Sequence, residues 1–172
     1  ARAAGAAPAA IRAGLRGFAG LPHRLQRVAE AAGVVWYDDS KGTNPAATAK
    51  SLEGFADGTV HLILGGRNKG ADLGQLAGIV GRKARRAYLI GEAAGDLEPA
   101  VAAVPHEVAG TLERAVRSAA AQARAGEVVV LSPACASFDQ FRNFVHRGEV
   151  FQTLVATVTG ARGGPHGEEA RL

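Results

Sequence analysis

The sequence has only one cysteine, Cys135, among its 172 residues. A single cysteine cannot form a disulfide within the chain, so a reducing, cytoplasmic compartment is expected. Long apolar runs are also missing. The stretch "VVVL" at 128–131 is typical of the short runs present, whereas a transmembrane helix needs about 20 apolar residues. The Ala-rich start has no apolar core followed by a cleavage site, so no signal peptide and no membrane insertion are predicted.

Several motifs of nucleotide and catalytic chemistry are absent as well. In "GGRNKGAD", residues 65–72, Lys69 precedes Gly70 and no hydroxyl residue follows to hold magnesium, so the segment is not a P-loop. The GxGxxG spacing is missing too. No G-x-S-x-G elbow occurs, and no motif ties a histidine to Cys135, so a buried, inert cysteine is favoured over a nucleophile. Scattered histidines and one cysteine give no ligand set, and no metal site is predicted.

The chain has more basic than acidic residues. The formal net charge is +4 and the pI is about 9.7, which invites a nucleic-acid reading. The densest basic stretch, "GRKARRA" at 81–87, has no interleaved aromatics, and a solvated helix end explains it without nucleic acid. Only four of the twenty basic residues are lysines. Lys41 and Lys69 stand in candidate loops, where a compact ammonium suits anion binding.

What the sequence does contain is an alternation of strand and helix patterns. Helices are predicted over 1–17, 44–56, 72–80 and 111–125, and over 138–158 with a break near Gly148. A hairpin is predicted over 23–40, with Gly33 near its turn, and buried strands over 60–66, 86–91 and 127–133. Continuous apolar strands between helices indicate a mostly parallel sheet covered on both faces. The fold class predicted is therefore α/β, doubly wound, with an N-terminal hairpin.

In such sheets ligands collect at the carboxyl ends of the strands. Here those ends are "DDSKGTN" at 38–44, "GGRNKGAD", "GEAAGD" at 91–96 and "SPACASFDQF" at 132–141. Three of these segments have two interpretations. Thr43 and Asn44 either cap a helix or help to bind an anion, and the glycine segment is either a plain turn or an anion loop. Ser137 is either a helix N-cap or a ligand donor.

Four segments together resemble a known family. "GLPHR" at 20–24, "DDSKGTN", "ILGGRNKGAD" at 63–72 and "LSPACASFDQFRNFVHRG" at 131–148 occur in this order. Over about residues 17–158 the chain resembles the C-terminal domain of the Mur ligases. The resemblance is to the branch that adds D-glutamate to UDP-N-acetylmuramoyl-L-alanine through an acyl phosphate. The resemblance implies a Rossmann-like domain that delivers the amino acid and closes over ATP.

The resemblance also implies how the chain is divided. Residues 1–16 would be the tail of a preceding, central ATPase domain and 17–159 the C-terminal domain. The composition of 160–172 separately predicts a flexible tail. ATP and Mg²⁺ would be bound mainly by the central domain. The 172-residue chain alone is therefore expected to be inactive, and no catalytic residue is assigned to it.

The resemblance implies ligand roles for nine residues. Those expected at the D-glutamate site are Lys41, Thr43, Lys69, Ser137, Phe138 and Phe144. Those expected at the edge that meets ATP are His23, Arg24 and Asp39. Lys69 and Thr43 match residues that hold the α-carboxylate, and Ser137 with the backbone at Phe144 matches the grip on the side-chain carboxylate. Lys41 matches a lysine of the same pocket, near the phosphates.

Two residues depart from the family pattern. Gly42 stands where alanine is frequent, which is expected to loosen that turn slightly. Val145 replaces a frequent glutamate, although Arg147 and Gly148 are kept. Two alternatives remain open: another Mur or folylpolyglutamate-type ligase domain, and a stand-alone Rossmann-like binding module.

Overall fold

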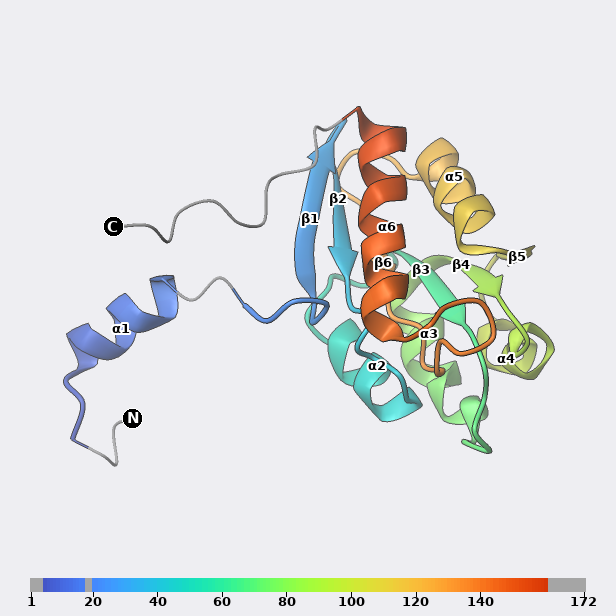
Figure 1. The fold of residues 1–172 in the computed structure, drawn as a ribbon, viewed down its shortest axis with the longest axis horizontal. Helices are drawn as coiled ribbons and strands as arrows, with labels where there is room; N and C mark the ends of the chain where they lie inside the picture. Colours follow the sequence, from blue (N-terminus) through green and yellow to red (C-terminus); the bar gives the residue numbers. More distant parts are fainter. Residues whose placement is uncertain (1–4, 18–19, 161–172) are drawn as a thin grey trace.

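The computed structural model describes residues 5–17 and 20–160, where a six-stranded sheet carries helices on both faces (Figure 1). The strands are β1 (Gln26–Ala31), β2 (Val34–Asp38), β3 (Val60–Gly65), β4 (Ala84–Ile90), β5 (His106–Gly110) and β6 (Val128–Leu131). The helices are α1 (Pro8–Gly17), α2 (Pro45–Leu52), α3 (Ala77–Lys83), α4 (Ala94–Val101), α5 (Leu112–Gln122) and α6 (Phe144–Thr159), with a 3₁₀ turn η1 (Leu73–Leu76). The predicted α/β class is confirmed.

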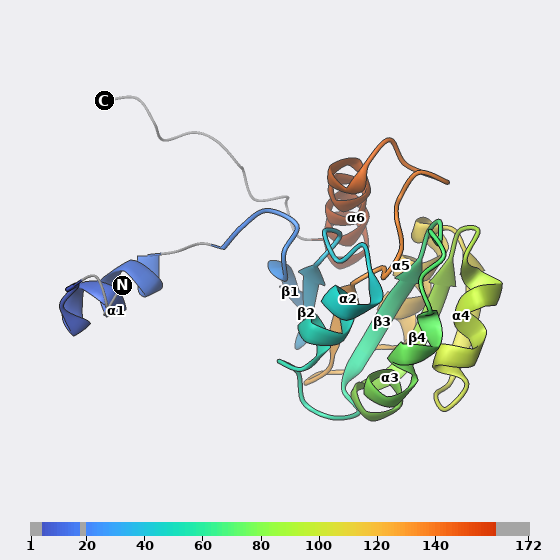
Figure 2. The same cartoon turned by 90° about the horizontal axis from the view of Figure 1, so that it is seen from below.

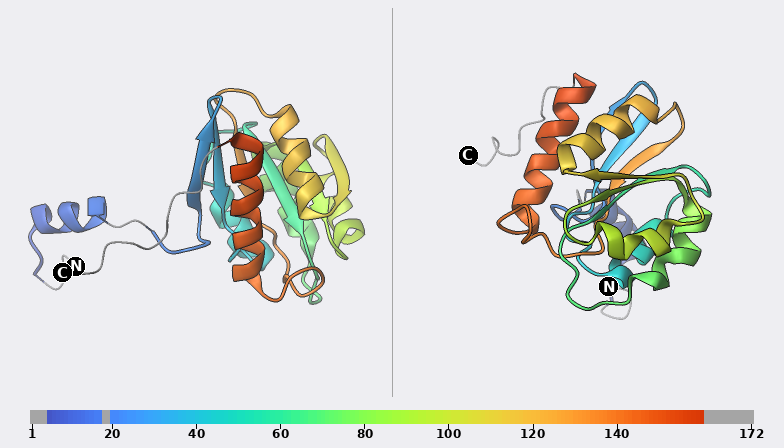
Figure 3. Two further views of the ribbon diagram at one scale, coloured as in Figure 1. Left: turned by 45° about the horizontal axis from the view of Figure 1, so that its top comes forward. Right: turned by 90° about the vertical axis from the view of Figure 1, so that its right-hand side faces the viewer.

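The two faces of the sheet bury separate apolar clusters. Along β3, Leu62 and Leu64 pack under α2, α3 and α4, whereas Ile63 packs under α5 and α6. This division follows from the alternation of side chains along a strand. Figures 2 and 3 show α5 and α6 together on one face and α2, α3 and α4 on the other. A strand that is buried on both faces needs apolar side chains at nearly every position, which is why the central parallel strands are near-continuous apolar runs.

The strand order, β1-β2-β6-β3-β4-β5, brings distant segments together. β1 pairs antiparallel with β2, and the remaining neighbours are parallel. β6 comes last in the chain but lies between β2 and β3, so the carboxyl ends of these three strands meet. Past the strands, Gly65 N donates to Pro133 O (2.9 Å), and Arg67 and Ala136 exchange both backbone hydrogen bonds. The shared edge predicted from the sequence is confirmed.

Two elements were not predicted. α4 contains Pro99, and a proline inside a helical pattern ordinarily marks an end. β5 is an edge strand of five residues with a largely exposed pattern, so it lacks the apolar run that revealed the other parallel strands. β5 is held by its pairing with β4, and α4 packs mainly against η1 and α3. Tertiary contacts therefore decide structure that the local sequence signal leaves out.

The last helix differs from its prediction. α6 begins at Phe144, where Asn143 is the N-cap and accepts from His146 N (2.9 Å). Ser137 is therefore not the N-cap; its carbonyl instead closes a turn by accepting from Gln140 N and Phe141 N. The predicted break near Gly148 is also wrong, because α6 runs unbroken through it. The glycine is needed for close packing rather than for a kink.

Replacing Gly148 with alanine tests this packing. Alanine inside a helix ordinarily stabilises by about 1 kcal/mol over glycine. Here the new Cβ would lie 2.2 Å from His23 Nδ1 and 2.7 Å from Asp38 Oδ2, so we expect a net loss of roughly 2 kcal/mol of unfolding free energy. Gly78→Ala in α3 is the control, since nothing lies within 4 Å of its added Cβ. Urea unfolding that shows Gly148→Ala as stable as the control would contradict this account.

The chain ends and the basic stretch also differ from expectation. α1 covers the second part of the helix predicted over 1–17. Gly160 ends α6 in a left-handed conformation (φ 66°), and the rest of the predicted tail lies outside the described residues. Lys83, read as part of a solvated helix end, is buried, with Nζ 2.6 Å from Phe55 O and 2.7 Å from Asp57. In the described part of the chain no helix is long and apolar enough to span a bilayer.

Candidate functional site

The residues predicted to bind ligands lie along the edge of the sheet where β2, β6 and β3 end. The antiparallel strand β1 starts at this edge, which brings the segment before it alongside β2: Lys41 N donates to His23 O (3.0 Å). The loop after β3 carries Lys69. The turn after β6 carries Ser137 and Phe138, and α6 starts beside it at Phe144. The fold thus gathers four segments that are far apart in the sequence.

Two lysines at this edge are held over aromatic rings. Lys41 Nζ lies 3.9 Å from the centroid of the Phe144 ring, and Lys69 Nζ lies 5.1 Å from that of Phe138. Within the described residues neither ammonium has a carboxylate partner. Phe138 is 55% exposed, unusual for a large apolar side chain in this domain. A ring face attracts a cation without neutralising it, so both charges remain available to an anion.

Hydroxyl and amide groups accompany the lysines. Ser137 is buried and Thr43 half-buried, and neither side-chain hydroxyl makes a hydrogen bond inside the part of the chain that the structure describes. Phe144 is the first residue of α6, where backbone N–H groups have no partner within the helix. Such amides and the helix dipole favour negative charge. Cation, hydroxyl and helix start together suit the binding of carboxylates.

Arg147 organises this edge, a role that the sequence reasoning missed. Its side chain is completely buried in α6 and reaches the ends of three strands. It donates to Ser40 O (3.0 Å) and Ser40 Oγ (3.0 Å) after β2, to Cys135 O (3.2 Å) after β6, and to Gly65 O (3.4 Å) in β3. Burial lowers the pKa of the guanidinium to about 10, so it stays charged at neutral pH. The available signal was a charged residue on an otherwise apolar helix face.

His23 is engaged inside the domain. It is 7% exposed, and its Nδ1 lies 2.7 Å from Asp38 Oδ2, which also accepts from Gln152 Nε2 (2.8 Å). The His23 ring meets the Phe144 ring edge-on, with centroids 6.2 Å apart. Its Nδ1 is therefore used within the fold, and only the Nε2 side of the ring is left for a ligand. The exposed Arg24 follows directly in the chain.

Asp39 is buried among hydroxyl groups. Its Oδ2 accepts from Ser51 Oγ (2.7 Å) and Ser132 Oγ (2.6 Å), and its Oδ1 accepts from Leu25 N (3.2 Å). A Cβ on Gly42 would lie 2.8 Å from Asp39 Oδ2 and 2.9 Å from Ser132 Oγ. The missing Cβ at Gly42 therefore leaves room for the Asp39 carboxylate, and the looser turn expected at Gly42 stays a prediction.

The Asp39 carboxyl is expected to affect stability in acid. Burial raises its pKa above the ordinary 3.8, more than the hydroxyl hydrogen bonds lower it. Because the pKa of Asp39 is higher in the folded state, this carboxyl group stabilises the fold fully at pH values below its ordinary pKa. The stabilisation is lost as the pH rises through the pKa of the folded state. The unfolding free energy of the wild type minus that of Asp39→Asn should therefore fall across this window and level off above it. Urea unfolding at a series of acidic pH values measures this difference, and a difference that rises with pH would contradict it.

A cavity of about 300 Å³ opens beside the start of α2. Its lining residues are Arg24, Leu25, Asp39, Lys41, Gly42, Ala47, Lys50 and Ser51. Three of them, Arg24, Lys41 and Lys50, are cations, which favour an anion such as a phosphate chain. It contains two of the three residues expected to face ATP, together with Lys41. Among residues 5–17 and 20–160 no three His, Cys, Asp or Glu side chains are grouped to hold a metal ion.

Cys135 contributes its backbone rather than its thiol. The side chain is 2% exposed, and burial raises the pKa of the thiol to about 11. Its carbonyl accepts from both terminal nitrogens of Arg147. The predicted burial of Cys135 is confirmed. A buried thiol with a raised pKa is a poor nucleophile, which supports the prediction that it is inert.

The sequence is similar to that of a known protein family and of named relatives. The profile of the family described as "Mur ligase, glutamate ligase domain" matches residues 23–135. The chain is 48% identical over 155 residues to the UDP-N-acetylmuramoylalanine--D-glutamate ligase of Thiobacillus denitrificans, and 50% over 146 residues to that of Desulfatibacillum aliphaticivorans. These matches cover 89% and 84% of this chain but 33% and 32% of the relatives. The chain thus spans about a third of the length of the curated relatives it matches.

Solved structures share the fold at lower identity. A murein peptide ligase from Psychrobacter arcticus superposes with a TM-score of 0.62 at 18% identity, covering 89% of this chain and 33% of that one. The E. coli FolC structure in complex with DHPP and ADP gives 0.59 at 22% identity, covering 91% and 37%. The MurF ligase of Thermotoga maritima in complex with ADP gives 0.53 at 16%, covering 84% and 33%.

Proposed function

Since this chain belongs to the Mur ligase family and carries its glutamate ligase domain, we propose that it is the D-glutamate-binding and ATP-closing domain of a longer peptidoglycan ligase. The complete enzyme would add D-glutamate to UDP-N-acetylmuramoyl-L-alanine in the cytoplasm, using ATP. The name shared by relatives at 48% and 50% identity supports this substrate. Residues 17–159 would form the domain, and residues 1–16 would belong to the preceding ATPase domain.

One observation carries the proposal: cations, free hydroxyls and a helix start lie along a single edge of the sheet. D-Glutamate has two carboxylates and needs two separated anion sites. Lys69 with Thr43 would bind the α-carboxylate. Ser137 and the amide of Phe144 would bind the side-chain carboxylate, with Phe138 beside it. Charge-assisted hydrogen bonds of this kind are stronger than neutral ones.

The domain's share of the reaction would be positioning. The carboxylate of the acceptor would be activated by ATP as an acyl phosphate, and the amine of D-glutamate would attack it, giving the amide, ADP and phosphate. Holding the amine at the reacting carbon contributes through proximity. His23, Arg24 and Asp39 would form the edge that closes on ATP, with Lys41 near its phosphates. Mg²⁺ would be held mainly by the central domain and would neutralise the phosphate charge.

The proposal is tested with the protein encoded by the complete reading frame. That protein should release phosphate only when UDP-N-acetylmuramoyl-L-alanine, ATP and D-glutamate are all present. L-Glutamate, L-lysine and meso-diaminopimelate are the control amino acids. The 172-residue chain alone should show no turnover, because the nucleotide would be bound mainly by the preceding domain. Equal activity with a control amino acid would contradict the assignment of D-glutamate, and turnover by the isolated chain would contradict the division into domains.

A further inference from the structure

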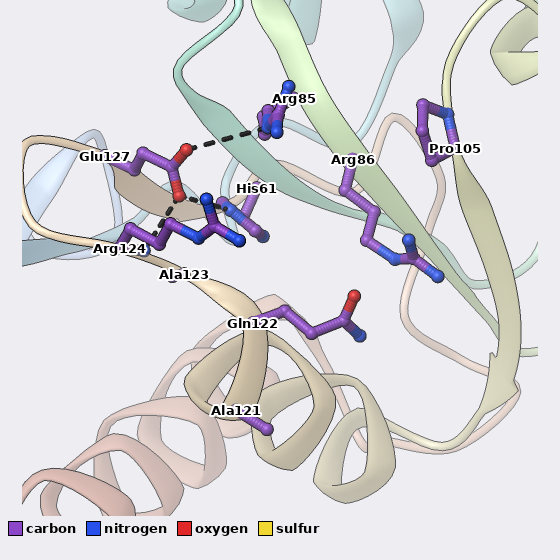
Figure 4. A pocket seen from close by; sticks show the side chains of 9 residues that line it. All are labelled: His61, Arg85, Arg86, Pro105, Ala121, Gln122, Ala123, Arg124 and Glu127. Carbon is purple, nitrogen blue, oxygen red and sulfur yellow. Dashed lines mark hydrogen bonds and ion pairs between the residues drawn. The ribbon is translucent and has the colours of Figure 1, made fainter.

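A second cavity lies at the opposite edge of the sheet, where the parallel strands begin. It measures about 430 Å³, within the range of small-molecule sites. His61 and Arg86 lie near the starts of β3 and β4, and Glu127 immediately precedes β6. The end of α5 closes the other side with Gln122 and Arg124. Figure 4 shows Arg86 and Gln122 reaching into the same space from the strand and from the helix.

The lining is strongly cationic. Three arginines, Arg85, Arg86 and Arg124, face one acidic lining residue, Glu127. Burial lowers the pKa of His61, which favours the neutral imidazole. The one carboxylate of the lining offsets one of the three guanidinium charges, so two positive charges remain uncompensated. Net charge of this size around a cavity attracts small anions.

Hydrogen bonds hold the Glu127 carboxylate, the one acidic group of the lining, to one side of the cavity. Glu127 Oε2 lies 2.9 Å from His61 Nε2 and accepts from the backbone N of Arg124 (2.8 Å). On its other side His61 Nδ1 meets the Tyr88 hydroxyl at 2.9 Å, which fixes the ring. Arg85 Nε is 3.7 Å from Glu127 Oε1, too long for a hydrogen bond. Figure 4 shows Glu127 on the His61 side, away from Arg86.

Arg86 has a donor without an acceptor. Its Nε is buried, and no hydrogen-bond partner for it occurs in the described residues. A buried N–H without a partner costs free energy, so native structures normally satisfy such groups. The guanidinium fork matches the geometry of phosphate oxygens. The basic stretch 81–87, which the carboxylate site at the other edge does not use, supplies this side chain.

We propose that this amino-edge cavity binds a small phosphorylated anion. A phosphomonoester is nearly a dianion at neutral pH, which matches the two uncompensated charges. Arg86 binds it through its two terminal nitrogens, and Arg124 and the Gln122 amide complete the contacts. The site lies across the sheet from the proposed D-glutamate site and does not depend on the reaction assigned to that edge.

The test is a titration of the 172-residue chain followed by ¹H–¹⁵N NMR, including the arginine Nε–Hε signals. Glycerol 3-phosphate and inorganic phosphate are the two probes, with sodium chloride at matched ionic strength as the reference. Saturable shifts of the Arg86 Nε–Hε and Gln122 amide signals are expected for glycerol 3-phosphate. Saturation by inorganic phosphate with the same affinity would assign the site to free phosphate. The backbone amides of Gly42 and Gly70 report separately on phosphate binding at the other edge.

Two variants and one control decide the role of the arginines. Arg86→Gln should weaken glycerol 3-phosphate binding by about tenfold or more, as expected for loss of a charged bidentate contact. Arg124→Gln, at an exposed position, should weaken it as well and serves if Arg86→Gln fails to fold. Arg114→Gln removes an exposed cation elsewhere on α5 and should leave the affinity unchanged. Shifts that follow sodium chloride, or equal affinity in the variants and the control, would overturn the proposal.

Discussion

Replacing Lys69 with alanine in the complete ligase is expected to raise the KM for D-glutamate roughly 10- to 100-fold, the range given by losing one charged hydrogen bond. Lys69 is exposed, lies in the loop after β3 and has no carboxylate partner in the described residues. Its charge therefore contributes little to folding, and the unfolding free energy should change by less than about 0.5 kcal/mol. The KM for ATP should change much less. Steady-state kinetics with each substrate varied in turn measures both constants.

The matched variants separate a specific contact from a general loss of charge. Arg117→Ala removes an exposed cation from α5, where Glu113 is its ion-pair partner, and should leave the KM for D-glutamate unchanged. Lys69→Arg keeps the charge but changes the shape of the donor, so we expect partial recovery. An unchanged KM for D-glutamate in Lys69→Ala would reject the proposed α-carboxylate site.

Arg147→Met is expected to lower the unfolding free energy of the chain by about 3 kcal/mol or more. The methionine fills part of the volume but leaves the carbonyls of Ser40, Gly65 and Cys135 without their donor at completely buried positions. Removing the buried charge offsets some of this cost, because desolvating a guanidinium is unfavourable. Since three strand ends lose a common partner, the unsatisfied acceptors outweigh that gain. Urea unfolding followed by circular dichroism measures the difference.

Arg142→Met is the control for this experiment. Arg142 is exposed and precedes α6, so its replacement should change the unfolding free energy by less than about 0.5 kcal/mol. Arg147→Lys tests geometry at constant charge. A single ammonium cannot reach acceptors on three segments as a guanidinium does, so most of the loss should remain. If Arg147→Met proved as stable as Arg142→Met, the hydrogen bonds from Arg147 to the strand ends would not be needed for stability.

Much of the architecture was predictable from local pattern. Buried parallel strands such as β3 are continuous apolar runs, and α5 follows a capping threonine, so both appear directly in the residues. The hairpin β1–β2 was equally clear, with Gly33 at its turn in a left-handed conformation (φ 75°). β5 and α4 were not predictable in this way. One is an edge strand with a single buried residue and the other contains a proline. Tertiary contacts determine both, since β5 pairs with β4 and α4 packs mainly against η1 and α3.

The candidate site, like the fold, could be predicted from the sequence only in part. The residue types and their order at the strand ends identified Lys41, Lys69 and Ser137 as candidates, and the parallel topology implied a common edge. The sequence could not indicate that Lys41 lies over Phe144 or that His23 uses its Nδ1 on Asp38. These contacts join residues that are far apart in the chain, and no local pattern records them.

By itself, the sequence determined the fold class, the family resemblance and the chemistry available at the carboxyl edge, because strand pattern and residue type act locally. Only the tertiary structure decided that α6 starts at Phe144, that Gly148 lies in close contact with His23, and that Arg147 ties three strand ends together. It also placed Arg86 in a cationic cavity at the opposite edge. The physical reason is that burial and hydrogen-bond partners depend on the neighbours a residue acquires when β6 inserts between β2 and β3.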